Sequence, residues 1–430
     1  MLSEKEKSLL GLIDENRDGI VRYLRKLLAF RTVTPAQGQR AETGDFLEHQ
    51  RVVSETLEES GFRVETWEIE PSKLEPFPGA YIDPERDLSN MPVLVGRLRG
   101  QGGGRSLILN GHYDVVPPGI VENWKHDPFG AEIEDNRIFG RGSSDMKGGI
   151  AAMVQALRII HTSGIRLNGD VTVEIVPDEE ATSMGTLACC QKGYNADGAV
   201  IPEPTDMNVL IAVRGNLSGT ITVFGRAGHA DINQPHWKEG GAVNAISKAA
   251  KIVLALEDLT REWRDRPDKR HPYLDPDIIV PTTISGGKWV VSYPEEVKIG
   301  FTADFNSPAA NLREEIEAQL KRVAAADSWM REHPPLLEAD LMYGAEIDRN
   351  EPIAMAAFTT LEELGFQPRF CGWGTLTDAI HLVNYSKIPT VSIGPDGRTA
   401  HETDEYLDIE QLTATAKALA LLILRWCGSE

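Results

Sequence analysis

The feature that most constrains the fold is an alternation of short apolar strands with amphipathic helices. Strand-like segments occupy residues 93–98, 106–110, 171–176 and 198–201, and helical patterns occupy residues 147–161 and 184–192. Residues 106–110 form an almost continuous apolar run, which is typical of a strand buried on both faces of a parallel sheet. Strands that alternate with helices therefore predict an α/β fold with a mostly parallel sheet.

The pattern changes between residues 213 and 332. Alternating strand-like segments occur at 215–225, 278–285 and 297–305, with long helical patterns at 243–259 and 311–325 and a charged loop at 261–277. This order predicts a smaller α+β domain with one open sheet face. Helical patterns at 352–364 and 409–425 flank a further strand at 390–393. We therefore expect residues 213–332 to be inserted into a larger domain of residues 1–212 and 333–430.

Composition excludes several classes of protein. The 430 residues are 41% hydrophobic and 25% charged, as in a globular protein. The net charge of −21 disfavours nucleic acid and anionic membranes as partners. The late apolar run at 418–424 is much shorter than the roughly 20 residues that a membrane helix needs. With four cysteines, no Cys-x-x-Cys pair and no signal-like N-terminus, we expect a cytoplasmic protein with free thiols.

Histidines and acids recur where the predicted strands end. They are His112 and Asp114 after 106–110, Asp178 to Glu180 after 171–176, Glu203 after 198–201 and His401 after 390–393, together with Asp145 before the helix at 147. The carboxyl ends of parallel strands line the ligand crevice of α/β sheets. Imidazole and carboxylate ligands without thiolates suit a hard or borderline divalent cation.

Each motif alone also has a structural interpretation. His112 can be a hydrogen-bonded turn residue, Asp145 a helix cap, and residues 178–180 a solvated acidic turn. Together they favour a metal site, because two metal ions bridged by a carboxylate form the co-catalytic centre of many hydrolases. Residues 100–104 lack the glycine spacing and the following helix of a dinucleotide-binding loop, which disfavours an oxidoreductase.

Six motifs occur in one order over most of the chain. They are His112-x-Asp114, Gly-Arg-Gly-x-x-Asp145-x-Lys-Gly-Gly, Asp-Glu179-Glu180, Pro-Glu203-Pro-Thr, Gly-His229-Ala and His401-Glu402. This set resembles the dinuclear zinc family of acetylornithine deacetylase, succinyl-diaminopimelate desuccinylase, aminoacylase and glutamate carboxypeptidase. The resemblance implies a mostly parallel-sheet α/β catalytic domain with an inserted small α+β dimerisation or lid domain. It further implies two divalent metal ions (zinc first, cobalt or manganese as alternatives), a small acylated substrate and a homodimer.

The resemblance also implies a role for each matched residue. In this resemblance, His112 and Glu203 are the terminal ligands of one metal ion, Glu180 and His401 are those of the other, and Asp145 bridges the two. Asp114 orients His112, and Glu179 is the general base. His229 reaches the partner's active site and donates to the oxyanion of the tetrahedral intermediate.

Three departures from the family pattern concern the substrate. Val291-Ser292-Tyr293-Pro294 stands where the family often has Asn before Val-Ile-Pro, Asp304-Phe305-Asn306 where it has Asp-x-Arg, and Thr377-Asp378-Ala379-Ile380 where it has Thr-Asp-Ala-Arg. Arginine forks suit carboxylates, so Asn306 and Ile380 disfavour a free α-carboxylate in the substrate. We expect substrate contacts from Ser292, Asn306, Trp373 and Thr375.

These features predict a metal-dependent amidohydrolase that removes an acyl group from an acylated amino acid or a related amine. A metal-bridged hydroxide would attack the acyl carbon, with Glu179 as the base. A dipeptidase or carboxypeptidase that uses the same dinuclear site is the alternative, and the missing arginines disfavour it. A non-catalytic binding protein on the same fold is a remote alternative, since the base and every ligand are present.

Overall fold

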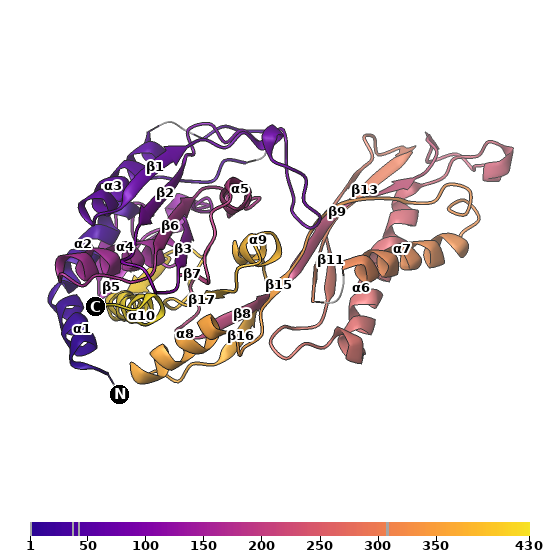
Figure 1. Cartoon of the computed structure of the whole chain (residues 1–430). Helices are drawn as coiled ribbons and strands as arrows, with labels where there is room; N and C mark the ends of the chain where they lie inside the picture. Colours follow the sequence, from indigo (N-terminus) through magenta and orange to yellow (C-terminus); the bar gives the residue numbers. More distant parts are fainter. Residues whose placement is uncertain (1, 37, 42–43, 307–308) are drawn as a thin grey trace. The chain divides into compact units, whose positions relative to one another are not determined.

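The computed structural model describes residues 2–36, 38–41, 44–306 and 309–430 (Figure 1). The chain forms two compact units. The large unit consists of Met1–Ala212, Ala345–Cys371 and Thr377–Glu430, and the small unit of Val213–Gly344 and Gly372–Leu376. The fold class is confirmed: a small α+β unit interrupts the sequence of an α/β unit.

The large unit is built on a sheet of nine strands within the described residues. Its order is β1 (Arg63–Trp67), β2 (Val93–Leu98), β6 (Val171–Val176), β3 (Leu107–His112), β7 (Ala199–Ile201), β17 (Thr390–Ser392), β8 (Val209–Val213) and β15 (Ala345–Glu346), and β16 (Phe370–Trp373) also pairs with β8. The central strands β6, β3, β7 and β17 are parallel, whereas β1, β2 and β8 join antiparallel. The parallel centre brings the ends of β3, β6, β7 and β17 to one edge.

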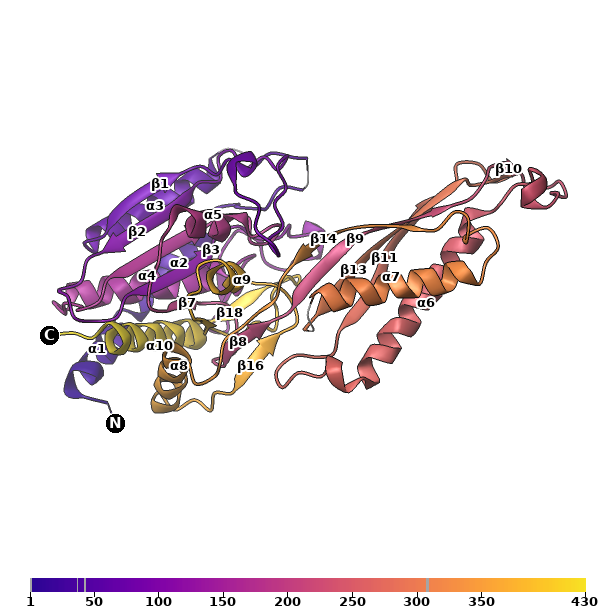
Figure 2. The ribbon, with the colours of Figure 1, turned by 45° about the vertical axis from the view of Figure 1, so that its right-hand side comes forward.

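Helices cover both faces of this sheet. They are α1 (Glu4–Glu15), α2 (Arg17–Leu28), α3 (Asp45–Glu59), α4 (Lys147–Thr162), α5 (Met184–Lys192), α8 (Pro352–Glu363), α9 (Ala379–Asn384) and α10 (Ile409–Cys427), with short 3₁₀ turns η1 (Pro71–Lys73) and η2 (Val121–Asn123). Figures 1 and 2 show α4 and α5 on opposite faces, and α4 is almost entirely buried because it packs against α2, α10 and β3. Within the described residues, no helix combines the length and hydropathy needed to cross a bilayer.

A second, three-stranded sheet connects distant parts of the large unit. It consists of β4 (Glu132–Glu134), β5 (Arg137–Phe139) and β18 (Tyr406–Asp408), in the order β18-β5-β4. The pairing of β18 with β5 joins the segment after His401 to the segment before Asp145.

The small unit packs two helices on one face of a four-stranded antiparallel sheet. The strands are β9 (Gly215–Phe224), β11 (Ile278–Gly286), β13 (Glu296–Phe305) and β14 (Leu336–Met342), the helices are α6 (Ala245–Asp265) and α7 (Ala309–Ala325), and β10 (Gly228–His229) with β12 (Ser292–Tyr293) forms a separate ladder. Two 3₁₀ turns, η3 (Trp237–Glu239) and η4 (Pro267–Lys269), complete the unit. Alternating buried residues of β9 and β13 form its core with α6 and α7.

Two elements differ from the expectation for this region. The predicted domain end at 332 lies before β14, which pairs with β9 from Leu336 to Met342 and so extends the small unit to Gly344. None of the residues of β14 is fully buried, which explains why it lacks a strong strand pattern. Helix α6 continues to Asp265, into the predicted loop at 261–277, because Trp263 packs into the core of the small unit.

Candidate active site

His112 is held rigidly at the end of β3. All six residues of this strand are buried, so the imidazole extends from the core of the sheet. Its Nδ1 lies 3.0 Å from the backbone oxygen of Asp114, and this contact directs Nε2 away from the main chain. The Asp114 carboxylate is farther from Nδ1, at 3.8 Å. The predicted orienting contact is therefore made by the main chain of Asp114, and its side chain has other partners.

The side chain of Asp114 organises the loop after β6. It accepts hydrogen bonds from the backbone N–H groups of Glu179 at 3.2 Å and Glu180 at 3.3 Å, and from the Thr34 hydroxyl. Buried carboxylates need such partners, since an unpaired buried charge is costly. Asp114 thus positions the two acids of the predicted Asp-Glu-Glu motif. Thr34 is a contributor that no sequence motif indicated.

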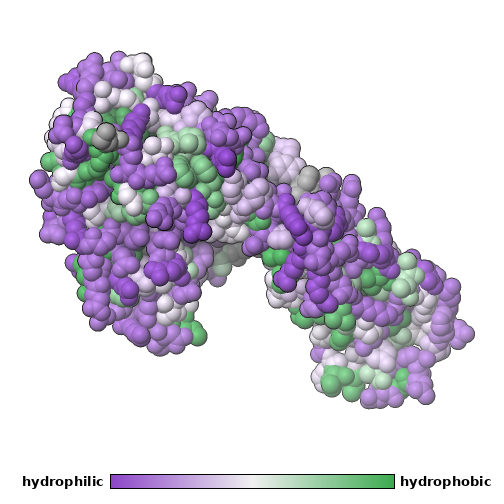
Figure 3. All heavy atoms as spheres, turned by 90° about the horizontal axis from the view of Figure 1, so that it is seen from below, coloured by the Kyte–Doolittle hydropathy of each residue, from purple (hydrophilic) through white to green (hydrophobic). Residues whose placement is uncertain are grey.

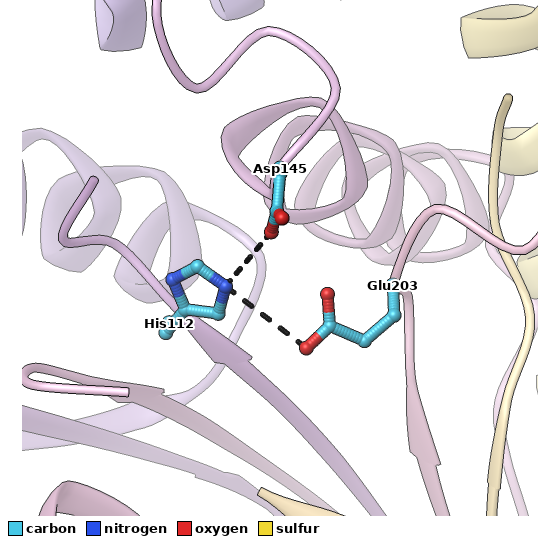
Figure 4. Close-up of side chains that lie close together, drawn as sticks. All are labelled: His112, Asp145 and Glu203. Atoms are coloured by element: carbon cyan, nitrogen blue, oxygen red, sulfur yellow. Dashed lines mark hydrogen bonds and ion pairs between the residues drawn. The ribbon is translucent and has the colours of Figure 1, made fainter. Parts of the chain in front are cut away.

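The carboxylates of Asp145 and Glu203 point toward the Nε2 atom of His112 (Figure 4). This atom lies 3.1 Å from Asp145 Oδ1 and 3.9 Å from Glu203 Oε1. His112, Asp145 and Glu203 are all buried, and one ligand atom from each lies within 4.8 Å of the others. They come from β3, from the start of α4 and from the end of β7. This grouping could hold a divalent metal ion.

A second triad shares Asp145 with the first. His401 Nε2 lies 3.3 Å from Asp145 Oδ2 and 3.1 Å from Glu180 Oε2. The two oxygens of Asp145 therefore contact different histidines. A carboxylate that offers one oxygen to each of two ligand sets has the arrangement of a bridging ligand. The structure brings together all five residues that were predicted as metal ligands.

The excess of buried carboxylates at this site favours a bound cation. Glu179 Oε2 is 3.8 Å from His112 Nε2, and Glu203 Oε2 is buried without a hydrogen-bond partner. Burial, together with the neighbouring carboxylates, raises the pKa of Glu179 and of Glu203 well above the ordinary value. Adjacent acids repel one another unless a positive charge lies between them. Crowded carboxylates with two imidazoles, without cysteine, fit divalent metal ions.

Asp378 is a buried carboxyl that sequence reasoning did not select as a site residue. It begins α9, and burial raises its pKa to about 7. Its charge also raises the pKa of Glu179 and Glu203, so it lies within electrostatic reach of both. The signal in the sequence is the Thr377-Asp378-Ala379-Ile380 segment, in which only Ile380 was linked to the substrate.

The other predicted site residues belong to the small unit. His229 of β10 pairs with Ser292 of β12, and its Nδ1 accepts the backbone N–H of Asp231 at 3.2 Å. The Asn306 side chain donates to the carbonyls of Lys269 and Asp275. Trp373 is half-buried and Thr375 is exposed. These residues therefore share a unit with one another but not with the two triads.

Two carboxylate-linked triads lie at the carboxyl edge of a parallel sheet, with a further glutamate beside them, and this arrangement could serve as the metal centre of a hydrolase. Comparison with known proteins agrees, because the model of Peptidase family M20/M25/M40 matches residues 108–425. The chain belongs to this metal-dependent family. The resemblance inferred from the six motifs is thereby confirmed.

Curated relatives match almost the whole chain. N-formyl-4-amino-5-aminomethyl-2-methylpyrimidine deformylase of Bacillus subtilis is 29% identical over 98% of this chain and 97% of its own length. The protein of the same name from Halalkalibacterium halodurans is also 29% identical, over the same shares. The predicted activity class is confirmed: the chain is an amide-bond hydrolase of its family.

Solved structures share the fold at lower identity. A tripeptidase from Staphylococcus aureus has a TM-score of 0.72 at 21% identity and covers 96% of this chain and 99% of its own. Human carnosine dipeptidase 1 has a TM-score of 0.73 at 16% identity and covers 99% of both chains. At such identities the likeness establishes the fold of the chain alone.

Proposed function

We propose that the protein is a metal-dependent deacylase that hydrolyses the N-acyl amide of a small amine. A formyl amide of an aminomethyl-pyrimidine is the first substrate to test, because relatives matching 98% of the chain are named for that deformylation. The observation that carries the proposal is the pair of triads that share Asp145, with Glu179 beside them.

Two divalent ions fit the donor set. We assign His112, Asp145 and Glu203 to one ion and Asp145, Glu180 and His401 to the other. Zinc is the first candidate, with cobalt or manganese as alternatives, since the ligands are imidazole and carboxylate. When bound, such ions polarise the scissile carbonyl and make a water molecule more acidic.

Glu179 is the residue that moves protons in this proposal. Its side chain is only 12% exposed and lies beside His112 without belonging to either triad. Burial and the charges of Glu203 and Glu180 raise its pKa, so the carboxylate readily accepts a proton. Glu179 takes this proton from the attacking water and returns it to the nitrogen of the leaving amine.

The substrate is expected to lack a free α-carboxylate. Ile380 is buried in α9 and offers no charge, and the Asn306 amide donates to two backbone carbonyls. Neither position supplies the guanidinium fork that a carboxylate prefers. An acylated amine therefore fits better than an acylated amino acid or a peptide.

We further propose a cytoplasmic homodimer in which His229 serves the active site of the partner subunit. The small unit exposes several large apolar side chains: Leu254, Val280, Ile284, Trp289, Val290 and Leu336. Figure 3 shows hydrophobic spots, in green, on a mainly hydrophilic surface. Exposed apolar residues of this kind are common at subunit interfaces.

A hydrolysis screen tests the proposal. Protein loaded with zinc, cobalt or manganese would be offered N-formyl and N-acetyl aminomethyl-pyrimidines, acylated amino acids and dipeptides, each with a chelator control. We expect chelator-sensitive release of formate or acetate from the amine substrates. Activity on dipeptides alone would favour the peptidase alternative, and activity that survives complete metal removal would overturn the proposal.

A further inference from the structure

Glu405 is a buried carboxylate that collects backbone N–H groups around Asp145. Its Oε1 accepts from Ser144 at 2.9 Å and from Asp145 at 3.1 Å, and its Oε2 accepts from Gly142 at 3.1 Å. The side chain has no exposed surface. Glu405 therefore fixes the backbone of the segment that presents Asp145.

Arg141 joins this carboxylate to His401. Its Nη1 donates to Glu405 Oε2 at 2.6 Å, and its Nη2 donates to the backbone oxygen of His401 at 3.2 Å. The Arg141 side chain is only 2% exposed. One planar group thus contacts both the partner of Asp145 and the main chain of His401.

His401 needs such a contact. Its φ of 64° lies in the left-handed region, which is unfavourable for a side chain larger than glycine. Its imidazole is half exposed, so packing restrains it less than His112. Backbone conformations of this kind persist only where neighbouring groups enforce them.

We propose that Arg141 and Glu405 are positioning residues that set metal affinity: Glu405 for both triads, which share Asp145, and Arg141 for the Asp145–Glu180–His401 triad. Glu405 acts through the backbone of Asp145, and Arg141 acts through the carbonyl of His401. Neither touches the substrate or a reacting atom. The inference rests on the metal centre assigned under the proposed function. We call the ion held by His112, Asp145 and Glu203 the first ion and the ion held by Asp145, Glu180 and His401 the second ion.

The two residues have distinguishable effects. Because Asp145 belongs to both triads, loss of the Glu405 contacts should weaken both ions. Lysine at position 141 can still pair with Glu405, but its single ammonium lacks the planar fork that also reaches His401. R141K should therefore weaken the second ion selectively. Mutations of groups that support metal ligands typically cost about 10- to 100-fold in affinity.

Asp327 in the small unit provides a matched control. Its carboxylate accepts the backbone N–H groups of Trp329 at 3.0 Å and Met330 at 3.2 Å, and it pairs with Lys248 and Lys251. D327N removes a similar buried backbone-holding carboxylate, but far along the chain from every predicted ligand. It should lower thermal stability without changing metal affinity.

The test is a titration of metal-free full-length protein with cobalt. Binding is monitored by the visible absorption bands of bound Co²⁺ and by calorimetry. We expect two equivalents to bind to the wild type and to D327N. R141K should retain the first equivalent and lose about 10-fold or more in affinity for the second, and E405Q should weaken both. Wild-type binding curves for R141K and E405Q would overturn the inference.

The same data separate this inference from the proposed function. A wild type that binds no cobalt would refute the metal centre itself. If the wild type binds two ions but R141K, E405Q and D327N all lose metal affinity equally, then Arg141 and Glu405 are only general stabilisers of the fold. Thermal melting of each variant identifies any that fails to fold, and R141K, which keeps the charge, then remains the deciding variant.

Discussion

Glu179 and Asp145 both lie near His112 Nε2 but have different surroundings, and this difference suits them to the different roles that we propose. Asp145 contacts both His112 and His401, which lowers the pKa of its carboxyl despite its burial. Glu179 lies 3.8 Å from the His112 imidazole, and burial raises its pKa well above the ordinary value. A carboxyl that stays charged suits a bridging ligand, and one with a raised pKa suits proton transfer.

Glu179→Gln tests this division. The amide keeps the size of the side chain but cannot accept the proton, so we expect turnover to fall by about 10²-fold or more. Metal content should be unchanged, because neither triad includes Glu179. Steady-state kinetics and elemental analysis of the same preparation measure both quantities. Turnover near the wild-type value would remove Glu179 from the role of base.

At the scale of single residues, the sequence predicted the candidate metal ligands that follow strands. It did not predict the residues that hold those ligands in place. His112, Glu180 and Glu203 follow apolar runs, and parallel strands necessarily bring such ends together. Arg141 and Glu405 meet across 264 positions of sequence, so no local pattern relates them. The side chain of Asp114 was likewise assigned to His112, although its hydrogen bonds go to the following acidic loop.

At the scale of elements, the start of α4 fits closely against the loop that follows β7. A Cβ atom built on Gly149 would lie 2.1 Å from the backbone oxygen of Pro202, the residue before Glu203. This approach is possible only for glycine. Gly149 therefore lets the start of α4, which follows Asp145, approach the segment that carries Glu203.

Gly149→Ala should consequently damage both the fold and the metal site. Overpacking costs about 1–3 kcal/mol in the free energy of unfolding, and any shift of Pro202 moves Glu203 as well. We expect a lower urea midpoint and weaker binding of the first metal ion. Gly11→Ala in α1 is the control, since nothing lies within 4 Å of its added methyl group and alanine favours helices. Unchanged metal affinity in Gly149→Ala would refute the coupling.

An ion cluster links three helices of the large unit and makes its stability depend on pH. Glu6 of α1 accepts from Arg425 of α10 at 2.6 Å, and Arg425 also donates to Glu363 of α8. Partial burial opposes the charge of Glu6, but the bonds from Arg425 and Ser3 outweigh it and lower its pKa to about 2. A carboxyl with a lowered pKa stabilises the fold above its unfolded pKa, and this contribution is lost as pH falls.

Glu6→Gln should therefore reduce stability at neutral pH by about 1–2 kcal/mol. The difference from wild type should stay constant down to the ordinary glutamate pKa of 4.5 and shrink as the pH falls toward about 2. Urea unfolding across this range measures it. Glu4→Gln is the control, because Glu4 pairs with Lys7 on the exposed surface and should contribute little. A difference that grows on acidification would contradict the assignment.

Most elements followed from periodicity, and the exceptions have physical causes. Buried strands such as β3 and the apolar helix α4 carry strong patterns. The edge strand β14 does not, because its side chains are only partly buried, and its pairing with β9 is a tertiary contact. The domain boundary was expected at residue 332 because β14, which extends the small unit to Gly344, was not predicted as a strand.

At the scale of the whole molecule, residues expected to serve one reaction belong to two compact units. Glu179 and the triads lie in the large unit, whereas His229 lies in the small one. Because His229 Nδ1 accepts the backbone N–H of Asp231, the neutral ring carries its proton on Nε2. Nε2 can then donate to a developing oxyanion, a contribution of about 10²- to 10³-fold in turnover. The resemblance to known deacylases predicts that this donor comes from the partner subunit.

Mixed dimers test that prediction. Chains carrying Glu179→Gln and chains carrying His229→Ala would be given different affinity tags, coexpressed and purified through both tags. If His229 acts across the dimer, one site of each mixed pair combines an intact Glu179 with an intact His229, and activity recovers to about half of the wild-type value. If His229 acts within its own chain, both sites are defective and activity stays near that of either parent. Light scattering on the same sample reports whether a dimer is present, and a fully active monomer would contradict the donation from the partner subunit.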